Sequence, residues 1–143
     1  MKTGFTLIEL VFVIAIIGLL TVFAYPSYLN YMTRVHRNEA QTALLDLANR
    51  MERYFADHAT YQTATIGTQS INDILSNPST LENHYALSII HATANTYSLQ
   101  ATPQGTQGKA DTQCQSLTYN HLGQKNITKG PSGAPTGNSQ ACW

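Results

Sequence analysis

The sequence predicts an α+β protein in which one long, kinked N-terminal α-helix packs on an antiparallel sheet of three or four strands. Three observations predict this fold. An apolar run of about one membrane thickness lies near the start, a helical stripe of apolar residues continues it, and short segments of alternating polarity follow from residue 84 onward. At 143 residues, the chain is long enough for one domain with an appendage.

The first segment, residues 5–24, is apolar except at Thr6, Glu9, Gly18 and Thr21. At 1.5 Å per residue, a helix of this length spans about 30 Å, which is the hydrocarbon thickness of a bilayer. The segment is therefore predicted to be a membrane-spanning helix.

Three interpretations of this segment compete. A cleaved signal peptide is disfavoured, because only residues 1–4 precede the apolar run and no small-residue cleavage site follows it. A plain membrane anchor explains the length but neither the junction between Gly4 and Phe5 nor the acidic Glu9. In the third interpretation, residues 1–4 are a leader that is removed at the cytoplasmic face, and Phe5 becomes the new N-terminus of a retained helix.

The stretch Lys-Thr-Gly-Phe-Thr-Leu-Ile-Glu, from Lys2 to Glu9, is followed at once by the apolar run and resembles the class III signal of type IV pilins and related pseudopilins. This resemblance implies that a prepilin peptidase cleaves after Gly4 and methylates the amine of Phe5. It also implies a single-pass inner-membrane precursor with a cytoplasmic N-terminus. The inner-membrane assembly machinery would then add the chain to other pilin subunits in an extracellular helical filament.

Glu9 is the residue that a membrane anchor alone does not explain. A charged side chain at the centre of a membrane helix costs about 2.5–3.5 kcal/mol on insertion scales, and such residues are usually functional. Cleavage would create a positive amine on Phe5, and we expect Glu9 to pair with that amine on a neighbouring subunit. The alternative is a tolerated side chain that reaches the membrane interface.

The helix is predicted to continue beyond the assembly segment, residues 5–30, with a kink at Pro26. Residues 31–57 form its amphipathic half, because apolar residues recur there at spacings of three and four. The expected core face carries Met32, Val35, Ala40, Ala43, Leu44, Leu47, Ala48, Met51, Tyr54 and Phe55. The expected wetted face carries Arg37, Asn38, Glu39, Asp46, Asn49, Arg50, Glu52 and Arg53.

The rest of the globular head, which comprises residues 31–143, divides into a loop and a sheet. Residues 58–83 are predicted to be a connecting loop with a helical turn at Ile71–Leu75. Residues 84–143 are predicted to hold the sheet and a C-terminal loop. The expected strands begin near Tyr85, Tyr97 and Leu117, and the expected turns lie at Ala94–Asn95, from Pro103 to Gly108, and at Leu122–Gln124. After Gly123 the chain is predicted to be irregular.

The two cysteines, Cys114 and Cys142, both occur late in the chain. In an exported protein a disulfide is favoured, and two buried free thiols are the alternative. A bridge would stabilise the chain by about 3–4 kcal/mol in the chain-entropy model. It would correspond to the disulfide-bounded variable loop of pilins. The order of residues from Tyr97 to Trp143 resembles one subset of type IVa pilins, the minor pilins of pilus biogenesis and competence.

The sequence therefore predicts a structural, non-enzymatic subunit, by resemblance a minor pilin, that supports pilus assembly and with it adhesion, twitching motility or DNA uptake. No catalytic motif and no cofactor-binding fingerprint is recognised, and the five histidines show no metal-ligand spacing, so no metal site is predicted. One alternative is a DNA receptor that uses Lys109, Lys125 and Lys129. Another is a type II secretion pseudopilin, against which the late cysteines argue.

Overall fold

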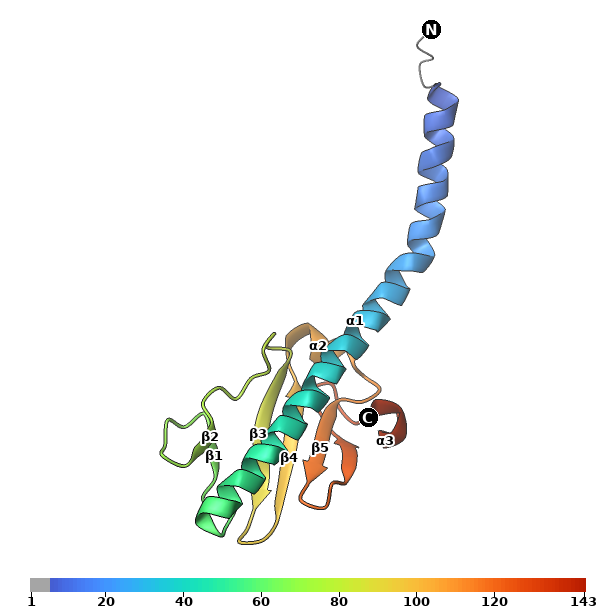
Figure 1. Ribbon diagram of the computed structural model, residues 1–143. Helices are drawn as coiled ribbons and strands as arrows, with labels where there is room; N and C mark the ends of the chain where they lie inside the picture. The colour runs from blue at the N-terminus through green and yellow to red at the C-terminus, as the bar shows by residue number, and fades with distance from the viewer. Residues whose placement is uncertain (1–5) are drawn as a thin grey trace. The chain divides into compact units, whose positions relative to one another are not determined.

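The computed structural model describes residues 6–143. The chain consists of two compact units, of which the first ends at Arg34 and the second comprises Val35–Trp143. Helix α1, Leu7–His58, contributes residues to both units (Figure 1). The predicted cleavage and methylation site, at Gly4 and Phe5, lies outside the described residues.

In the first unit, the large apolar side chains of α1 are exposed from Leu7 to Tyr31. This part of the helix is long and apolar enough to cross a membrane, and none of it is buried inside the structure. Pro26 lies within the helix. Because proline has no N–H, it cannot donate a hydrogen bond to the carbonyl of Val22. The bend expected at Pro26 stays a prediction.

In the second unit, α1 buries one face against the rest of the head. Its buried apolar residues are Ala40, Leu44, Leu47, Ala48, Met51 and Tyr54, which recur at helical spacing and confirm most of the predicted core face. Val35, placed on that face from the sequence, is instead 38% exposed. Arg37, which was predicted to face water, is buried with a relative exposure of 7%, so this prediction was wrong.

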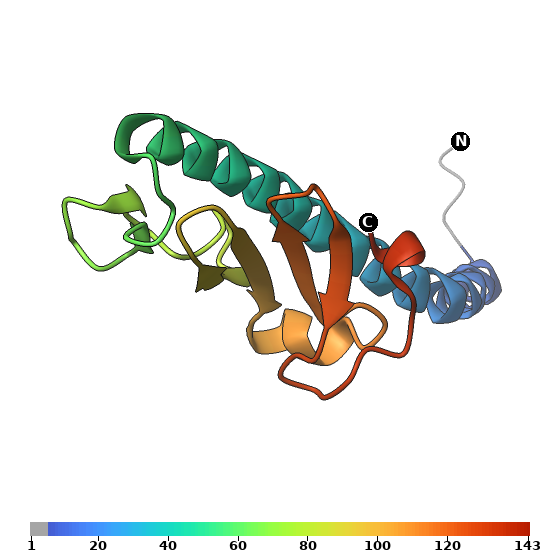
Figure 2. The ribbon, with the colours of Figure 1, turned by 90° about the horizontal axis from the view of Figure 1, so that it is seen from below.

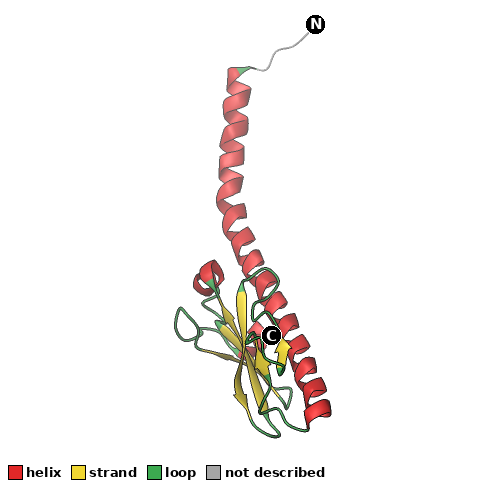
Figure 3. Ribbon diagram, turned by 90° about the vertical axis from the view of Figure 1, so that its left-hand side faces the viewer, coloured by secondary structure: helices red, strands yellow, loops and turns green. Residues whose placement is uncertain are grey.

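Four antiparallel strands follow in the order β3 (Tyr85–Ala92), β4 (Tyr97–Pro103), β5 (Ser116–Asn120) and β6 (Lys125–Thr128). They form a meander in which each strand pairs with the next along the chain (Figure 3). The sheet packs on one side of the second half of α1 (Figures 1 and 2). The predicted α+β class, with a long helix packed on an antiparallel sheet of three or four strands, is thereby confirmed.

The core lies between the helix and the sheet. Alternate residues of β4 are buried, beginning with Tyr97, as period-two polarity predicts. Each large apolar side chain that is fully buried contributes about 1.5–3 kcal/mol relative to exposure. The fully buried large apolar residues are Leu44, Leu47 and Met51 from the helix and Tyr85, Leu99 and Leu117 from the sheet.

The predicted helical turn at Ile71–Leu75 is wrong. The short strands β1 (Thr65–Ile66) and β2 (Asp73–Leu75) pair in parallel there. The Asp73 carboxylate holds the intervening turn, because it accepts hydrogen bonds from the hydroxyls of Thr65 at 2.5 Å and Thr68 at 2.8 Å. The bond from Thr65 is also the main cause that lowers the pKa of Asp73.

Two further segments differ from prediction. A short helix, α2 (Gly105–Ala110), replaces the turn expected from Pro103 to Gly108. The chain after Gly123 is also not wholly irregular, because it forms β6 and a last short helix, α3 (Ser139–Cys142). The side chain of Asn138 caps α3 by accepting a hydrogen bond from the N–H of Ala141 at 2.9 Å.

Candidate functional site

Glu9 lies in the first turns of α1, exposed among apolar neighbours such as Ile8 and Leu10. Its backbone N–H donates to the hydroxyl of Thr6 at 3.4 Å. Within the described residues, its carboxylate takes part in no ion pair or hydrogen bond. Glu9 is therefore a carboxylate on an apolar stretch of helix with no ion-pair or hydrogen-bond partner among residues 6–143.

A second carboxylate is completely satisfied within the head. Asp111 follows α2, and its side chain is fully buried. The guanidinium of Arg37 on α1 binds it with two hydrogen bonds, of 2.7 Å to Oδ1 and 3.0 Å to Oδ2. Such a bidentate pair is geometrically specific, so it joins α1 to the far end of α2 in one arrangement.

The buried pair extends into a larger network. Asp111 also accepts hydrogen bonds from the Tyr85 hydroxyl at 3.1 Å and from the N–H of Cys114 at 3.2 Å. The Tyr85 oxygen in turn accepts from the side-chain amide of Gln107 at 3.0 Å. Burial raises the pKa of Tyr85, so its phenol remains a donor to Asp111. This network was not predicted from the sequence. The one feature of the sequence that could have indicated it is that Asp111 is the only acidic residue after residue 84.

Cys114 and Cys142 form the predicted disulfide, which connects the start of the β5 region to α3. The adjacent Gln115 side chain is buried and donates to the carbonyls of Gly108 at 3.2 Å and Asp111 at 2.9 Å. Its oxygen accepts from the N–H of Ser132 at 3.2 Å. The C-terminal region is therefore packed on α2 by polar contacts as well as by the bridge.

The three candidate DNA-binding lysines are all exposed on this C-terminal region. Lys109 lies on α2, Lys125 begins β6, and Lys129 directly follows it. The hydroxyl of Ser132 donates to the carbonyl of Gly108 at 2.7 Å, which ties the segment after Lys129 to the helix that carries Lys109. The Lys125 ammonium lies 5.2 Å from the centre of the Trp143 ring, within cation–π range.

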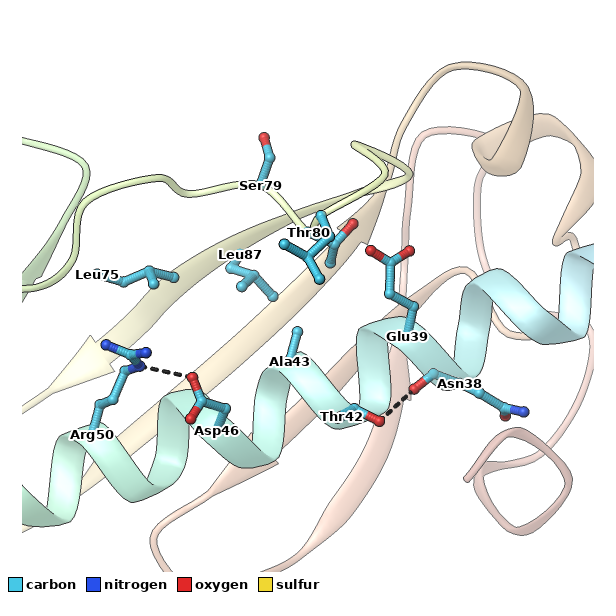
Figure 4. Close-up of a pocket in the computed structure, with 11 residues that line it drawn as sticks. Asn38, Glu39, Thr42, Ala43, Asp46, Arg50, Leu75, Ser79, Thr80 and Leu87 are labelled. Atoms are coloured by element: carbon cyan, nitrogen blue, oxygen red, sulfur yellow. Dashed lines mark hydrogen bonds and ion pairs between the residues drawn. The ribbon is translucent and has the colours of Figure 1, made fainter.

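A groove of about 550 Å³ runs between α1 and the segment that leads into β3 (Figure 4). One oxygen of Glu39 accepts from the N–H of Glu82 at 3.0 Å, and the other is buried with no hydrogen-bond partner in the part of the chain that is described. Further along the same helix, Arg50 pairs with Asp46 at 2.7 Å. The groove thus presents one carboxylate and one ion pair beside apolar side chains.

One group of metal-ligating side chains also comes together in the head. His36 on α1 meets Glu82 and His84, which precede β3, and one ligand atom of each lies within 4.8 Å of the others. The histidine spacing in the sequence gave no indication of this group, because its members come from distant segments.

Comparison with known families gives two matches. The family described as "Type IV minor pilin ComP, DNA uptake sequence receptor" matches residues 26–118, and the family described as "Prokaryotic N-terminal methylation motif" matches residues 1–25.

Individual relatives agree with these matches. The type II secretion system core protein G of Vibrio cholerae is 31% identical over 54% of this chain and 53% of its own length. The type IV major fimbrial protein FimA of Dichelobacter nodosus is 32% identical over 76% of this chain and 63% of its own length. The matched region thus spans less than two thirds of these relatives. Among solved structures, the non-core minor pilin PilV of Neisseria meningitidis has the same fold, with a TM-score of 0.53 and 24% identity over 76% of this chain and 98% of that chain.

Proposed function

The chain belongs to the ComP family of type IV minor pilins, and from this premise we propose that it is a filament subunit whose head binds DNA. The filament role is supported by the N-terminal methylation motif and by the exposed apolar half of α1, which suit membrane anchoring followed by burial in a pilus fibre. The fold and family are those of structural proteins rather than enzymes.

The finer steps of assembly belong to the same proposal. A prepilin peptidase cleaves after Gly4 and methylates Phe5, while the single-pass precursor is held in the inner membrane with its N-terminus in the cytoplasm. The inner-membrane assembly machinery then moves the chain into an extracellular fibre. There the carboxylate of Glu9 meets the amine of a neighbouring Phe5, since its partner is not found in residues 6–143.

The observation that carries the DNA-binding part is the charge of the C-terminal surface. From residue 84 onward the only acidic side chain is Asp111, which is fully buried and paired with Arg37. The exposed side chains of Lys109, Lys125 and Lys129 therefore have no exposed carboxylate near them in the sequence. Lysines that neutralise phosphates release counterions, which is the main source of sequence-independent DNA affinity.

The structure also restricts how these lysines are presented. The disulfide and the Gln115 hydrogen bonds hold the segments around Lys109 and Lys129 in place. The contact with Trp143 restricts Lys125. Charges that are held in place lose less side-chain entropy when they bind a phosphate backbone.

The test is DNA binding by the full-length protein in detergent micelles, with Lys109, Lys125 and Lys129 all changed to glutamine. Each lost phosphate contact is expected to lower the slope of log affinity against log salt by about 1. We therefore expect weaker binding at low salt and a slope lower by about 3 for the triple variant.

A matched control is available in the same chain. The double variant K125Q/K129Q is compared with R34Q/R53Q, which removes two exposed charges from α1 instead. Equal affinity and equal salt slope for these two double variants would refute the lysine site. Electron microscopy of fibres from the triple variant tests the filament role separately, because that role does not depend on the lysines.

The alternative function is that of a type II secretion pseudopilin. The similarity to the type II secretion system core protein G favours it. The two functions predict different defects in cells from which this protein has been deleted. Loss of surface fibres or of DNA uptake supports the pilus. A secretion defect with normal fibres and normal uptake supports the pseudopilin.

A further inference from the structure

We propose that His36, Glu82 and His84 form a binding site for a borderline divalent metal ion, for which Zn²⁺ is the first ion to test. Imidazole nitrogens and a carboxylate oxygen are ligands that zinc accepts in proteins, and two histidines with one glutamate form a known set of three protein ligands. The proposal does not depend on DNA binding, because none of the three is among the candidate lysines.

The spacing of the ligand atoms fits a metal ion. One ligand atom of each side chain lies within 4.8 Å of the other two. The His84 Nε2 and the Glu82 Oε2 are 3.5 Å apart. In a tetrahedral site with bonds of about 2.0–2.2 Å, two ligand atoms lie about 3.3–3.5 Å from each other. This edge of the site therefore already has the required length.

The hydrogen-bond network of the head determines the tautomer of neutral His36. Asp111 is a pure acceptor, so Tyr85 donates its proton to Asp111 and can only accept from Gln107. Gln107 must then present its NH₂ group to Tyr85 and its oxygen to the Nδ1 of His36, which lies 3.1 Å away.

It follows that Nδ1 of His36 carries the proton and Nε2 carries the lone pair. Histidines that bind metals usually donate their second N–H to an oxygen of just this kind, which orients the ring and selects the ligating nitrogen. Gln107 is buried with a relative exposure of 3%, and it is held in turn by the core tyrosine Tyr85. The partner behind His36 is thus in place without a metal.

The other two ligands also come from anchored backbone. The N–H of Glu82 donates to Glu39 on α1 at 3.0 Å, which holds this segment against the helix. The carbonyl of His84 accepts from the N–H of Gln104 at 2.8 Å. Little backbone movement is therefore required for binding, and the cost of organising the site is low.

Binding does require one side-chain adjustment. The rings of His36 and His84 are stacked, with centroids 3.6 Å apart and an angle of 24° between their planes. Because the lone pair lies in the ring plane, the His84 ring must turn so that both lone pairs point at one ion. The side chain of Glu82 is 68% exposed, so a fourth position remains open toward solvent. A bound ion would cross-link α1 to the segment that enters β3.

The experiment is isothermal titration calorimetry of the full-length, chelator-treated protein in detergent micelles with Zn²⁺, and with Cu²⁺ as a second ion. We expect the titration to show one ion bound per chain. In thermal unfolding of the same protein, the unfolding temperature should rise with ion concentration. The variants H84A and E82Q each remove a metal ligand. Loss of an outer-shell partner alone lowers metal affinity by about 10–100-fold, so each variant should lower it by that much or more.

The matched control is H91A, which removes an exposed histidine of β3 outside the group. It should bind as the unaltered chain does. E82Q changes an exposed side chain, so it remains informative if H84A does not fold. The proposal is overturned if neither ion binds saturably, or if E82Q binds as tightly as H91A.

Discussion

Two carboxylates, the exposed Glu9 and the buried Asp111, contrast the first unit of the chain with the head. Asp111 has every partner it needs inside the same chain, including a guanidinium, a phenol and a backbone N–H. Glu9 has no such partner in residues 6–143 and lies on a helix whose apolar side chains are exposed. The buried charges of Arg37 and Asp111 are paired within the head, whereas the first part of α1 exposes its apolar side chains and a carboxylate without a partner in residues 6–143.

The physical difference is one of desolvation. A charge that is removed from water needs compensating partners, and the fold supplies them to Asp111. Nothing in the described part of the chain does so for Glu9. We therefore expect Asp111 to control the stability of the head and Glu9 to control assembly, each with little effect on the other property. Variants of each carboxylate, and the pH dependence of the head, test this separation.

The largest expected effect is on assembly. The variant E9A should reduce surface fibres that contain this chain to near the detection limit, because the Phe5 amine of a neighbouring subunit would lose its counter-charge. Breaking a buried pair on one side costs about 3–5 kcal/mol, which is a factor of roughly one hundred to several thousand in an equilibrium constant. The measurement is immunodetection of the chain in sheared fibres.

The matched control is T21A on the same helix. Among the residues that the structure describes, the Thr21 hydroxyl bonds only to the carbonyl of Ile17. The variant T21A should assemble normally. The unfolding free energy of the head should be the same in E9A, T21A and the unaltered chain. Normal incorporation of E9A would contradict the assembly role of this carboxylate.

The next effect is on the stability of the head. D111A should lower the free energy of unfolding by about 3–5 kcal/mol, because it leaves the buried guanidinium of Arg37 unpaired. The double variant R37M/D111A should recover part of this loss, since neither charge then remains buried alone. Denaturant unfolding followed by circular dichroism measures both.

The exposed ion pair of Asp46 and Arg50 offers the comparison. D46A should cost only about 0.2–1 kcal/mol, because water screens a surface pair. If D111A and D46A had equal costs, the buried network would not be the stabilising element that the geometry indicates.

The smallest effect is a pH dependence of the same head. Burial raises the pKa of Tyr61 to about 12 and raises the pKa values of Tyr85 and Tyr97 as well. In the unfolded chain these phenols titrate near pH 10. The folded state therefore retains protons that the unfolded state releases. The stabilising contribution is complete below pH 10 and decreases as the pH rises toward the folded pKa values.

Thermal unfolding at a series of pH values above neutrality, with phenolate absorbance recorded in parallel, checks this prediction. The unfolding temperature should begin to fall near pH 10. Y61F should show a shallower fall, because it removes one of the three contributions while keeping the ring. A stability independent of alkaline pH would show that these hydroxyls are not held in their neutral form.

Local patterns were sufficient to predict the long helix and the strands β3, β4 and β5, but not the short elements β1, β2, α2, β6 and α3. Apolar residues at spacings of three and four predict the half of α1 that carries Leu44 and Met51, and alternation predicts β4 around Leu99. Each of these signals lies within one segment of chain, where backbone geometry alone sets the period. The same applies to the apolar run around Glu9. The pairing of Cys114 with Cys142 was predictable because no other cysteine is present.

Contacts between distant segments were not predictable in this way. Arg37 was predicted to face water because its polarity was considered on one helix alone, whereas its partner Asp111 lies 74 residues further on. His36 and Gln107, 71 residues apart, meet for the same reason. What the sequence by itself determined is therefore the long helix, the strands β3, β4 and β5, the apolar segment with Glu9, and the cysteine pair. Only the tertiary structure decided which charges are buried together, because the free energy of a buried polar group depends on partners that folding brings from elsewhere in the chain.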